Sequence, residues 1–476
     1  MNFTPVILWS DALVFLLLAT CLATVWFVRQ REHLLLPWRR VAQSGVALVS
    51  LLVLALFFGV GLLDSLHFRT VLPQSNGGEK VYSSEVLSVF DKLVEPLRTQ
   101  TEKTYSAPFA LTLYAKESAT DTQGNIVREY PRLQYGGAHL ADEAQRDSDV
   151  VWRTLTGGAA GFIAVTLLLV GIAAFRRRPQ SGGVNAKPFF NGWIPACAGM
   201  TSHKAWQPVI IAVFILAILT GALVNLASVY HVLGTDKVGQ DVLYLALKSI
   251  RTGLIIGTVT TLVTLPLALL LGIAAGYFRG WVDDVIQYIY TVLSSIPSVL
   301  LIAAAVLMMQ VTIDTNPDWF TTTAARADMR LVALCFILGV TSWTGLCRLL
   351  RGETLKLREM EYIQAAQSFG VSSLRILTRH IMPNLMHIIL IALVMDFSAL
   401  VLAEAVLSYV GVGVDPSMIS FGTMINGARL EMGREPMVWW ALAAAFTFML
   451  VLVLAANLFA DAVRDAFDPR LSRNTL

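Results

Sequence analysis

Apolar stretches of about 20 residues, the length that a helix needs to cross the hydrocarbon core of a bilayer, recur along this chain of 476 residues. Helices are favoured in lipid because they satisfy their backbone hydrogen bonds internally. The sequence therefore predicts nine membrane-spanning helices, at residues 11–28, 41–63, 157–175, 207–229, 249–276, 288–312, 330–350, 385–408 and 438–460.

The composition is that of a polytopic membrane protein, with 55% hydrophobic and only 14% charged residues and a mean hydropathy of +0.63. A net charge of +3 gives no electrostatic case for binding nucleic acid. The first apolar run is preceded by Asp11 and followed by its first basic residue, Arg29, which is the reverse of a secretory signal peptide. We expect this run to remain as an anchor.

Basic residues between the spans predict which loops face the cytoplasm, because Lys and Arg are retained on that face. Basic residues occur in three places. After the first span they are Arg29, Arg31, Arg39 and Arg40, after the third span they are Arg176, Arg177, Arg178, Lys187 and Lys204, and in the tail they are Arg464, Arg470 and Arg473. This pattern predicts an amino terminus outside and a carboxyl terminus in the cytoplasm. In the same topology the loop 353–383 is cytoplasmic.

Two segments interrupt the series of spans. Residues 64–150, which we call the outer domain, carry an acidic excess and lie outside in this topology. SSEVLSVFDKLVEPL has helical spacing, and FALTLYAKESATDTQGNIVREYPRL predicts two strands around a D-T-Q-G-N turn, so a small α/β insertion is expected. Residues 176–206 are rich in Pro, Gly and Ser and predict a linker.

The predicted organisation is therefore two spans in 1–63, the extracytoplasmic domain in 64–150, a third span in 151–175, a cytoplasmic linker in 176–206 and a six-span module in 207–476. The module boundary near residue 205 predicts that a chain without residues 1–205 would keep the partners of the six-span module.

The loop 353–383, which we call the coupling loop, is polar and helix-forming although apolar spans flank it. Residues 361–369 predict a short helix that Gly370 can end in the left-handed conformation. A second helix is predicted next, capped by Ser372 or Ser373 and running to His380. Pro383 then marks the return of the chain to lipid.

The composition of the coupling loop predicts a docking surface for another protein. The small Ala365 and Ala366 allow close approach, and apolar side chains could anchor a partner. The predicted anchors are Tyr362, Leu374, Ile376 and Leu377.

Four segments together resemble the ABC importer permeases. The first, Gln364-Ala365-Ala366 with Gly370 and His380-Ile381-Met382-Pro383, is similar to the EAA loop of that family, with Gln364 where the pattern usually has Glu and Met382 where it usually has Leu. The others are LGTDKVGQDVLY (233–244), AEAVLSYVGVGVDPSMISFGTMI (403–425) and ADAVRDAFDPRL (460–471). The resemblance covers about 205–476 and is to the second permease subunit of dipeptide and oligopeptide importers.

This resemblance implies an all-α polytopic membrane protein of the bacterial inner membrane, in which a six-helix permease module is preceded by about three extra transmembrane helices. It implies half of a translocation pore, a second permease subunit as heterodimer partner, two cytoplasmic P-loop ATPase subunits and an extracytoplasmic substrate-binding protein. The chain contains no GxxxxGK[ST] motif, so ATP and Mg²⁺ are expected on the partner subunits and no cofactor or catalytic residue on this one.

The resemblance also implies two sets of functional residues. Those that couple to the ATPase are Glu361, Gln364, Ala365, Ala366, Gly370, Arg375, His380 and Pro383. Those of an outer-surface motif are Gly234, Thr235, Asp236, Gly239 and Asp241. The spacing of Asp236 and Asp241 lacks the repeated ligands of a calcium loop, so we expect them to cap a short amphipathic helix and predict no metal site.

Asp396 and Glu404 lie in an otherwise apolar span, where a carboxylate is costly and faces a polar cavity or a partner. Two interpretations stay open: both line the pore or relay protons, or Glu404 reaches water at the outer end while Asp396 bonds a neighbouring helix. The first would suit an alternative function, an ion-gradient-driven secondary transporter, although no internal repeat supports it. A membrane sensor or scaffold is a third class, but it leaves the coupling loop unexplained. The substrate and the role of residues 1–205 are left open by the sequence.

Overall fold

The computed structural model describes residues 3–30, 32–71, 82–83, 85–120, 126–176, 203–320 and 322–467. Within these residues, nine helices are long and apolar enough to cross a membrane, and they confirm the predicted spans. Their bounds are α1 (Trp9–Arg29), α3 (Gly45–Asp64), α6 (Arg146–Arg176), α8 (His203–Ala227), α9 (Val242–Phe278), α11 (Ser298–Thr315), α12 (Thr323–Arg358), α15 (Met382–Val410) and α17 (Trp440–Phe467).

One predicted span is wrong in its extent. Residues 288–312 form two helices, α10 (Trp281–Ser295) and α11, rather than one. Pro297 separates them, because a proline disfavours helical backbone in the residue before it, and Ile296 is accordingly extended with φ −89° and ψ 132°.

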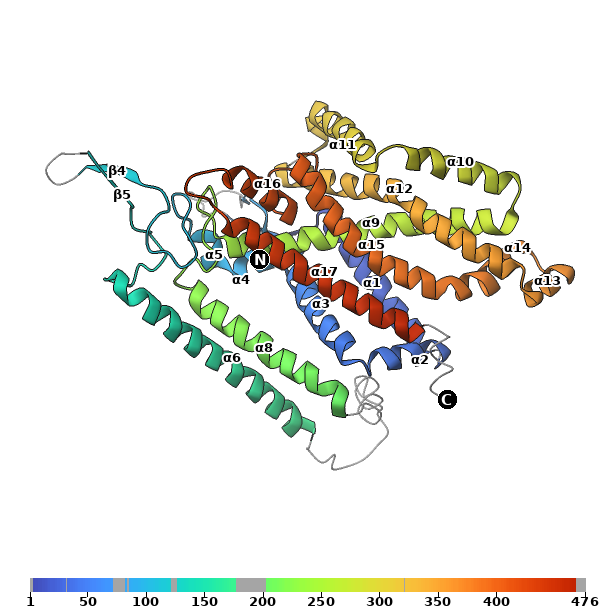
Figure 1. The fold of residues 1–476 in the computed structure, drawn as a ribbon, viewed down its shortest axis with the longest axis horizontal. Coiled ribbons are helices and arrows are strands. Elements are labelled where there is room, and N and C mark those ends of the chain that lie inside the picture. Colours follow the sequence, from blue (N-terminus) through green and yellow to red (C-terminus); the bar gives the residue numbers. More distant parts are fainter. Residues whose placement is uncertain are drawn as a thin grey trace.

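Short elements connect the spans. They are the helices α2 (Glu32–Val41), α4 (Val89–Leu93), α5 (Glu95–Thr99), α13 (Glu361–Ser368), α14 (Ser373–Ile376) and α16 (Phe421–Glu431), the 3₁₀ turns η1 (Glu143–Gln145) and η2 (Pro317–Trp319), and the π-helical segment η3 (Leu377–Ile381). Figure 1 shows that α4, α5 and the strands β4 and β5 gather at one end of the helical bundle, and α2, α13 and α14 at the other.

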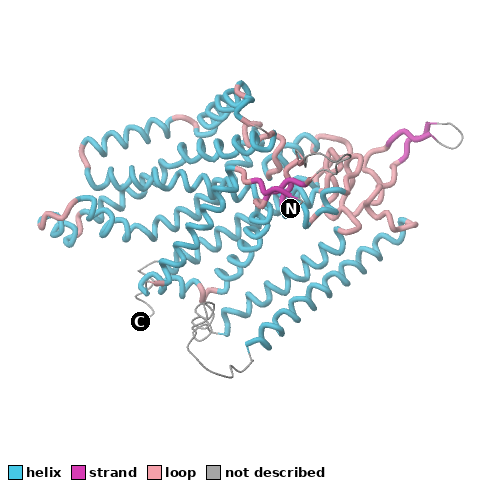
Figure 2. Tube along the Cα trace, turned by 180° about the vertical axis from the view of Figure 1, so that it is seen from behind, coloured by secondary structure: helices cyan, strands magenta, loops and turns pink. Residues whose placement is uncertain are grey.

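The outer domain holds most of the strands. Strands β1 (Phe3–Val6), β2 (His67–Thr70) and β3 (Leu87–Ser88) form one antiparallel sheet, so the chain start pairs with the segment after α3. Strands β4 (Glu117–Thr120) and β5 (Ile126–Glu129) confirm the two predicted strands and project from the body as a hairpin (Figure 2). The predicted turn, at residues 121–125, and most of the predicted linker, at 177–202, lie outside the described residues.

The long helix α9 is central to the six-span module. It packs most extensively against α12, where Gly272 and Gly276 bring the backbones together: a Cβ at either would lie 2.8 Å from a carbonyl oxygen of α12. It also contacts α3, α15 and α17, so helices from both predicted modules share one apolar core.

Helices α6 and α8 pair along their length at the side of the bundle (Figure 1). Gly157 and Gly161 of α6 follow the small-xxx-small spacing that lets transmembrane helices approach closely. A Cβ at Gly161 would lie only 2.1 Å from the carbonyl oxygen of Ala217, and one at Gly157 would lie 2.5 Å from that of Gly221. The close contact between α6 and α8 therefore depends on glycine at these positions, where a Cβ has no room.

Candidate functional site

The first half of the coupling loop folds as predicted, because α13 ends at a left-handed Gly370 with φ +74°. The N–H of Gly370 donates to the carbonyl of Gln367 (2.9 Å) and that of Val371 to the carbonyl of Ala366 (3.1 Å). These two bonds define a Schellman motif, and Val371 packs on the core beneath it, as the motif favours.

The second half differs from the prediction. The helix that starts at α14 does not end at His380 but continues through the π-helical segment η3 into α15, with Pro383 in its first turn. Proline has no N–H and its ring crowds the carbonyl four residues earlier, here that of Arg379, so the turn before it widens. Ser372 precedes α14 but makes no side-chain capping bond. The coupling loop is thus joined to α15 without a break.

The coupling loop has one buried and one exposed face. Ile363, Ile376 and Ile381 are fully buried in a core with α9 and α12. Phe369 and Leu374 point outward with 86% and 73% of their surface exposed. Large apolar side chains thus stand on the exposed face of the coupling loop.

The structure sorts the predicted docking residues. Tyr362, Leu374 and Ala365 are exposed as expected, but Ile376 is buried and Leu377 half-buried, so the prediction of these two as partner anchors is wrong. Both sit on the inner side of the short α14–η3 turn. Phe369, the last residue of the predicted helix 361–369, was not among the predicted anchors although it is the most exposed apolar side chain of the loop.

Polar contacts hold the loop to the ends of the neighbouring helices. Gln364 donates from Nε2 to the backbone oxygen (3.3 Å) and the carboxylate (3.4 Å) of Glu359, which itself pairs with Arg279 after α9. Gln367 donates to the hydroxyl of Tyr277 in α9 (3.3 Å). The remaining predicted coupling residues, Glu361, Arg375 and Pro383, are exposed, whereas Ala366 and His380 are half-buried.

The outer-surface motif is buried against the outer domain. Thr235 donates from Oγ1 to the carbonyl of Thr104 (2.9 Å) and accepts from the N–H of Ser106 (2.7 Å). Gly239, with φ +78°, lies so close to Glu102 that a Cβ would come within 1.8 Å of its carbonyl oxygen. Residues 102–106 of the outer domain therefore pack directly on this motif.

The two aspartates of this motif do not cap a short helix, which corrects the prediction. Asp241 caps the long α9, accepting from the N–H groups of Leu243 (2.8 Å) and Tyr244 (3.4 Å). Asp236 instead closes a turn by accepting from the N–H of Val238 and of Gln240, both at 2.9 Å.

His231 lies between two buried carboxylates. Its Nδ1 is 2.8 Å from Asp241 Oδ2, and its Nε2 is 3.4 Å from Glu102 Oε1, an ion-pair distance. Burial alone would lower the pKa of His231, but the carboxylates of Asp241 and Glu102 raise it to about 9.

Glu102 completes this cluster. Burial alone would raise its pKa, but His231 and the N–H groups of Gln134, Tyr135 and Gly136, at 2.8 to 3.1 Å, lower it to about 2. A charged triad thus fixes the outer domain to the start of α9. The sequence showed three titratable residues far apart and no spacing that would bring them together.

Two more ion pairs, one buried and one partly buried, join the amino-terminal residues to α9. Arg251 donates to Asp11 of α1 (2.7 Å), which also contacts His67 (2.7 Å). Lys248 pairs with Asp91 of α4 and lies 3.4 Å from Asp64 at the end of α3. Asp11, read in the sequence as a mark of topology, is fully buried.

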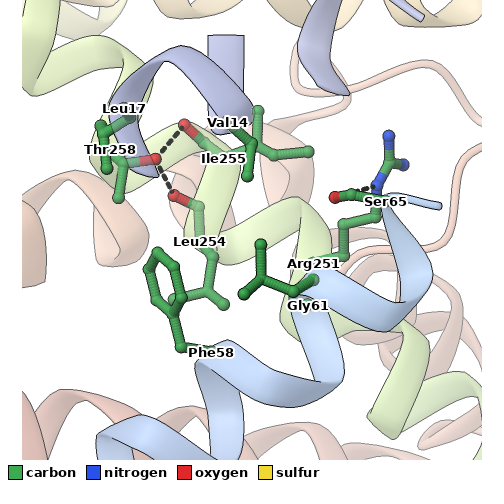
Figure 3. A pocket seen from close by; sticks show the side chains of 10 residues that line it. Val14, Leu17, Phe58, Gly61, Ser65, Arg251, Leu254, Ile255 and Thr258 are labelled. Atoms are coloured by element: carbon green, nitrogen blue, oxygen red, sulfur yellow. Dashed lines mark hydrogen bonds between the residues drawn. The ribbon is translucent and has the colours of Figure 1, made fainter. Parts of the chain in front are cut away.

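The helices around Arg251 pack tightly. Figure 3 shows the side chains of α1, α3 and α9 that meet there, with Ser65 accepting a bond from Arg251. The cavity left between them measures about 10 Å³, room for a single water molecule at most. Helix α1 is therefore part of the packed bundle.

The two intramembrane carboxylates differ. Glu404 is 2% exposed and accepts from the hydroxyls of Ser408 (2.7 Å) and Ser420 (2.9 Å), so the expectation that it reaches water is wrong. Asp396 is half-buried, and across the described ranges its carboxylate has no hydrogen bond or ion pair, so the expected bond to a neighbouring helix is absent there. The two carboxylates therefore have different surroundings within the described residues.

Comparisons with known proteins address the six-span module. Residues 268–473 match the family described as binding-protein-dependent transport system inner membrane component. The oligopeptide transport system permease protein OppC of Mycobacterium tuberculosis (strain ATCC 25618 / H37Rv) is 31% identical over 248 residues, 52% of this chain and 79% of the relative. The glutathione transport system permease protein GsiD of Pectobacterium atrosepticum is 34% identical over 241 residues, 51% of this chain and 73% of the relative.

A third relative is the dipeptide transport system permease protein DppC of Bacillus subtilis (strain 168), 29% identical over 247 residues, 52% of this chain and 71% of the relative. Among solved structures, an inward-facing conformation of the MetNI methionine ABC transporter aligns with 47% of this chain and 97% of that chain. The identity is 15% and the TM-score is 0.36, too low to argue from.

Proposed function

Because the chain belongs to the inner-membrane permeases of binding-protein-dependent ABC transport systems, we propose that it forms half of a peptide-translocating pore driven by cytoplasmic ATPase subunits. The permease type is that of the oligopeptide and dipeptide relatives, which supports peptide as the substrate class. The chain is a multi-pass membrane protein and a transport subunit, and ATP hydrolysis belongs to its partners.

The partners that we propose are a second permease subunit, two P-loop ATPase subunits and an extracytoplasmic binding protein. The family name, which states dependence on a binding protein, supports the last of these. The proposed orientation has the outer domain outside and the coupling loop in the cytoplasm, and the grouping of these segments at opposite ends of the bundle supports it (Figure 1).

One observation carries the proposal: the coupling loop is a folded surface with an exposed apolar pair, Phe369 and Leu374, and a helix that runs on into α15. A partner that moved this surface would move α15 with it, because no flexible joint separates them. That is what ATP-driven rocking of membrane helices requires.

The first test changes the exposed pair. Replacing Phe369→Ala and Leu374→Ala together removes apolar contact area from a docking site, so we expect at least a tenfold loss of ATPase co-purified with the tagged chain from native membranes. The thermal stability of the inserted chain should stay the same, because both side chains are exposed. The matched control, Ile363→Ala, opens a cavity in the core and should cost about 2 to 5 kcal/mol of stability.

A second, harsher change supports the same test. Gly370→Asp puts a side chain at φ +74°, and deletion of 364–370 removes most of α13 and the glycine that ends it, so both should abolish uptake and ATPase assembly while the chain stays inserted. Normal assembly of these variants would refute the docking role of the coupling loop.

The alternative, a gradient-driven transporter using Asp396 and Glu404, receives no support from the relatives, which are ABC permeases. The internal hydrogen bonds of Glu404 also argue against its use as a proton carrier. Mass spectrometry of the purified complex tests the choice: a P-loop ATPase and a second permease should accompany the chain. A chain that purifies alone and transports with a proton gradient but no ATP would reverse it.

A further inference from the structure

Asp396 lies at the midpoint of α15, inside the candidate membrane span Ile391–Val410. Its side chain is half-buried and, among the residues that the structure describes, nothing bonds to its carboxylate. A carboxylate at this depth is expensive in lipid and is kept where it faces water or a partner. Asp396 therefore requires water or a partner group that the described part of this chain does not supply.

The surroundings offer polar groups that Asp396 does not use. Two residues further along, Ser398 donates to the side-chain oxygen of Asn457 in α17 (2.8 Å). Two turns further along, Glu404 is fully engaged by Ser408 and Ser420. Ser398 and Glu404 are thus bonded within the chain, and Asp396 differs from them.

The position of Asp396 around the helix axis gives a direction. The uncovered face of the outer half of α15 carries Met395, Ala399, Leu402 and Val406. At about 100° per residue, Asp396 lies at the border between this face and the face packed on α9 and α17. Asp396 therefore lies at the edge of the packed surface and not at the centre of the uncovered face.

Asp396 is also rigidly connected to the coupling loop. Helix α14, the π-helical segment η3 and α15 follow one another without a break, so a helix of about 1.5 Å per residue links the docking surface to this carboxylate. Movement of the coupling loop would therefore move Asp396 with it.

We propose that Asp396 lines the aqueous translocation path and contacts the cationic group of the passing substrate, which for a peptide is its α-ammonium. The inference deepens the proposed function and rests on it. The α-amino group of a peptide has a pKa of about 7.7 to 8.0 and is largely protonated at neutral pH, so a carboxylate attracts it. A single fixed charge without further ligands would hold it weakly enough for release.

Water access is tested in the assembled complex in native membrane vesicles. The chain with its native cysteines replaced by Ala receives Asp396→Cys, and the probe is methanethiosulfonate ethyltrimethylammonium. We expect modification at least a hundredfold faster than for Leu402→Cys on the uncovered face or Ser398→Cys in the packed one. Equal rates at all three positions would overturn the path assignment.

Contact with the substrate is tested by uptake into proteoliposomes of the whole complex with its binding protein. Asp396→Asn should lower trialanine uptake at least tenfold while ATPase assembly stays normal, and Asp396→Glu should restore most of it. Uptake of N-acetyl-trialanine should not change. An equal loss for both peptides would overturn the ammonium contact.

Two further outcomes distinguish failure of the substrate contact from failure of the proposed function. If Asp396→Asn reduces co-purification of the second permease, the carboxylate pairs with that subunit and the substrate contact is refuted. If the wild-type complex transports neither peptide although its ATPase is bound, the proposed substrate class fails, and the cysteine modification rate still decides whether Asp396 lines a path.

Discussion

His231 has surroundings that a loop histidine does not normally have, since Asp241 and Glu102 flank its two ring nitrogens. The folded-state pKa of His231 is raised to about 9 from 6.5, so its contribution to stability is complete below pH 6.5 and is lost as the pH rises toward 9. The pKa of Glu102 is lowered to about 2 from 4.5, so its contribution is complete above pH 4.5 and is lost toward pH 2.

These two shifts predict that the attachment of the outer domain to α9 is most stable between pH 4.5 and 6.5. Hydrogen exchange of the N–H groups of Gln134, Tyr135 and Gly136, which bond to Glu102, would report it. After correction for intrinsic rates, protection should fall between pH 6.5 and 9, and His231→Gln should flatten that fall. Constant protection over this range would contradict the charged triad.

Gln364 shows how a departure from a family pattern can be read at residue level. Its amide donates to the backbone carbonyl oxygen and to the carboxylate of Glu359, and Glu359 in turn pairs with Arg279. A glutamate at this position would set a like charge beside Glu359. The neutral side chain therefore fits a loop end that already carries its own carboxylate.

At the scale of elements, the contact between α6 and α8 depends on Gly161. Replacing Gly161→Val places a Cβ where Ala217 has its carbonyl oxygen, so we expect the helices to separate at a cost of about 1 to 3 kcal/mol. Cysteines introduced as Gly158→Cys and Ile218→Cys, whose side chains meet, should then cross-link much less.

Gly171 provides the matched control for this prediction. A Cβ there meets nothing within 4 Å, so Gly171→Val should leave the cross-link intact. Loss of the cross-link in both variants would mean that the close approach at Gly161 is not what holds the pair.

The elements that the sequence predicted well are those set by local chemistry. Apolar length identified the spans, and the Gly370 end of α13 followed from a single residue with a left-handed preference. The break at Pro297 was missed because apolar residues continue on both sides of it. The burial of Ile376 and the exposure of Phe369 depend on how the coupling loop packs on α9 and α12, which no local pattern states.

At the scale of the whole molecule, the boundary near residue 205 divides the sequence but not the packed core. Asp11, Asp91 and Glu102 supply the acids, and Arg251, Lys248 and His231 supply the bases of three buried contacts across it. Breaking one buried pair by removing a partner costs about 3 to 5 kcal/mol. The ion pairs therefore argue against the expectation that a chain without residues 1–205 keeps its partners.

We now expect a chain without residues 1–205 to accumulate poorly and to bind no ATPase, because Arg251 and Lys248 of α9 lose their acids and His231 loses one of its two carboxylates. Co-expression of residues 1–190 with residues 191–476 should restore both, as measured by the yield of the tagged fragment in membranes. Full ATPase binding by the chain without residues 1–205, expressed alone, would show that the six-span module is independent.

The π-helical segment Leu377–Ile381 has a consequence for how this chain can vary. An α-helix turns about 100° per residue, so the number of residues in this segment sets the phase between the docking face of the coupling loop and the face that carries Asp396. Because a π-helical turn holds one residue more than an α-helical turn, deleting one residue would let the wide turn close to an ordinary one with the two faces still in phase, whereas adding one residue to the α-helix on either side would rotate one face by about 100° against the other. We therefore expect the chain to accept the loss of one residue in this segment but no single insertion in the α-helix on either side of it.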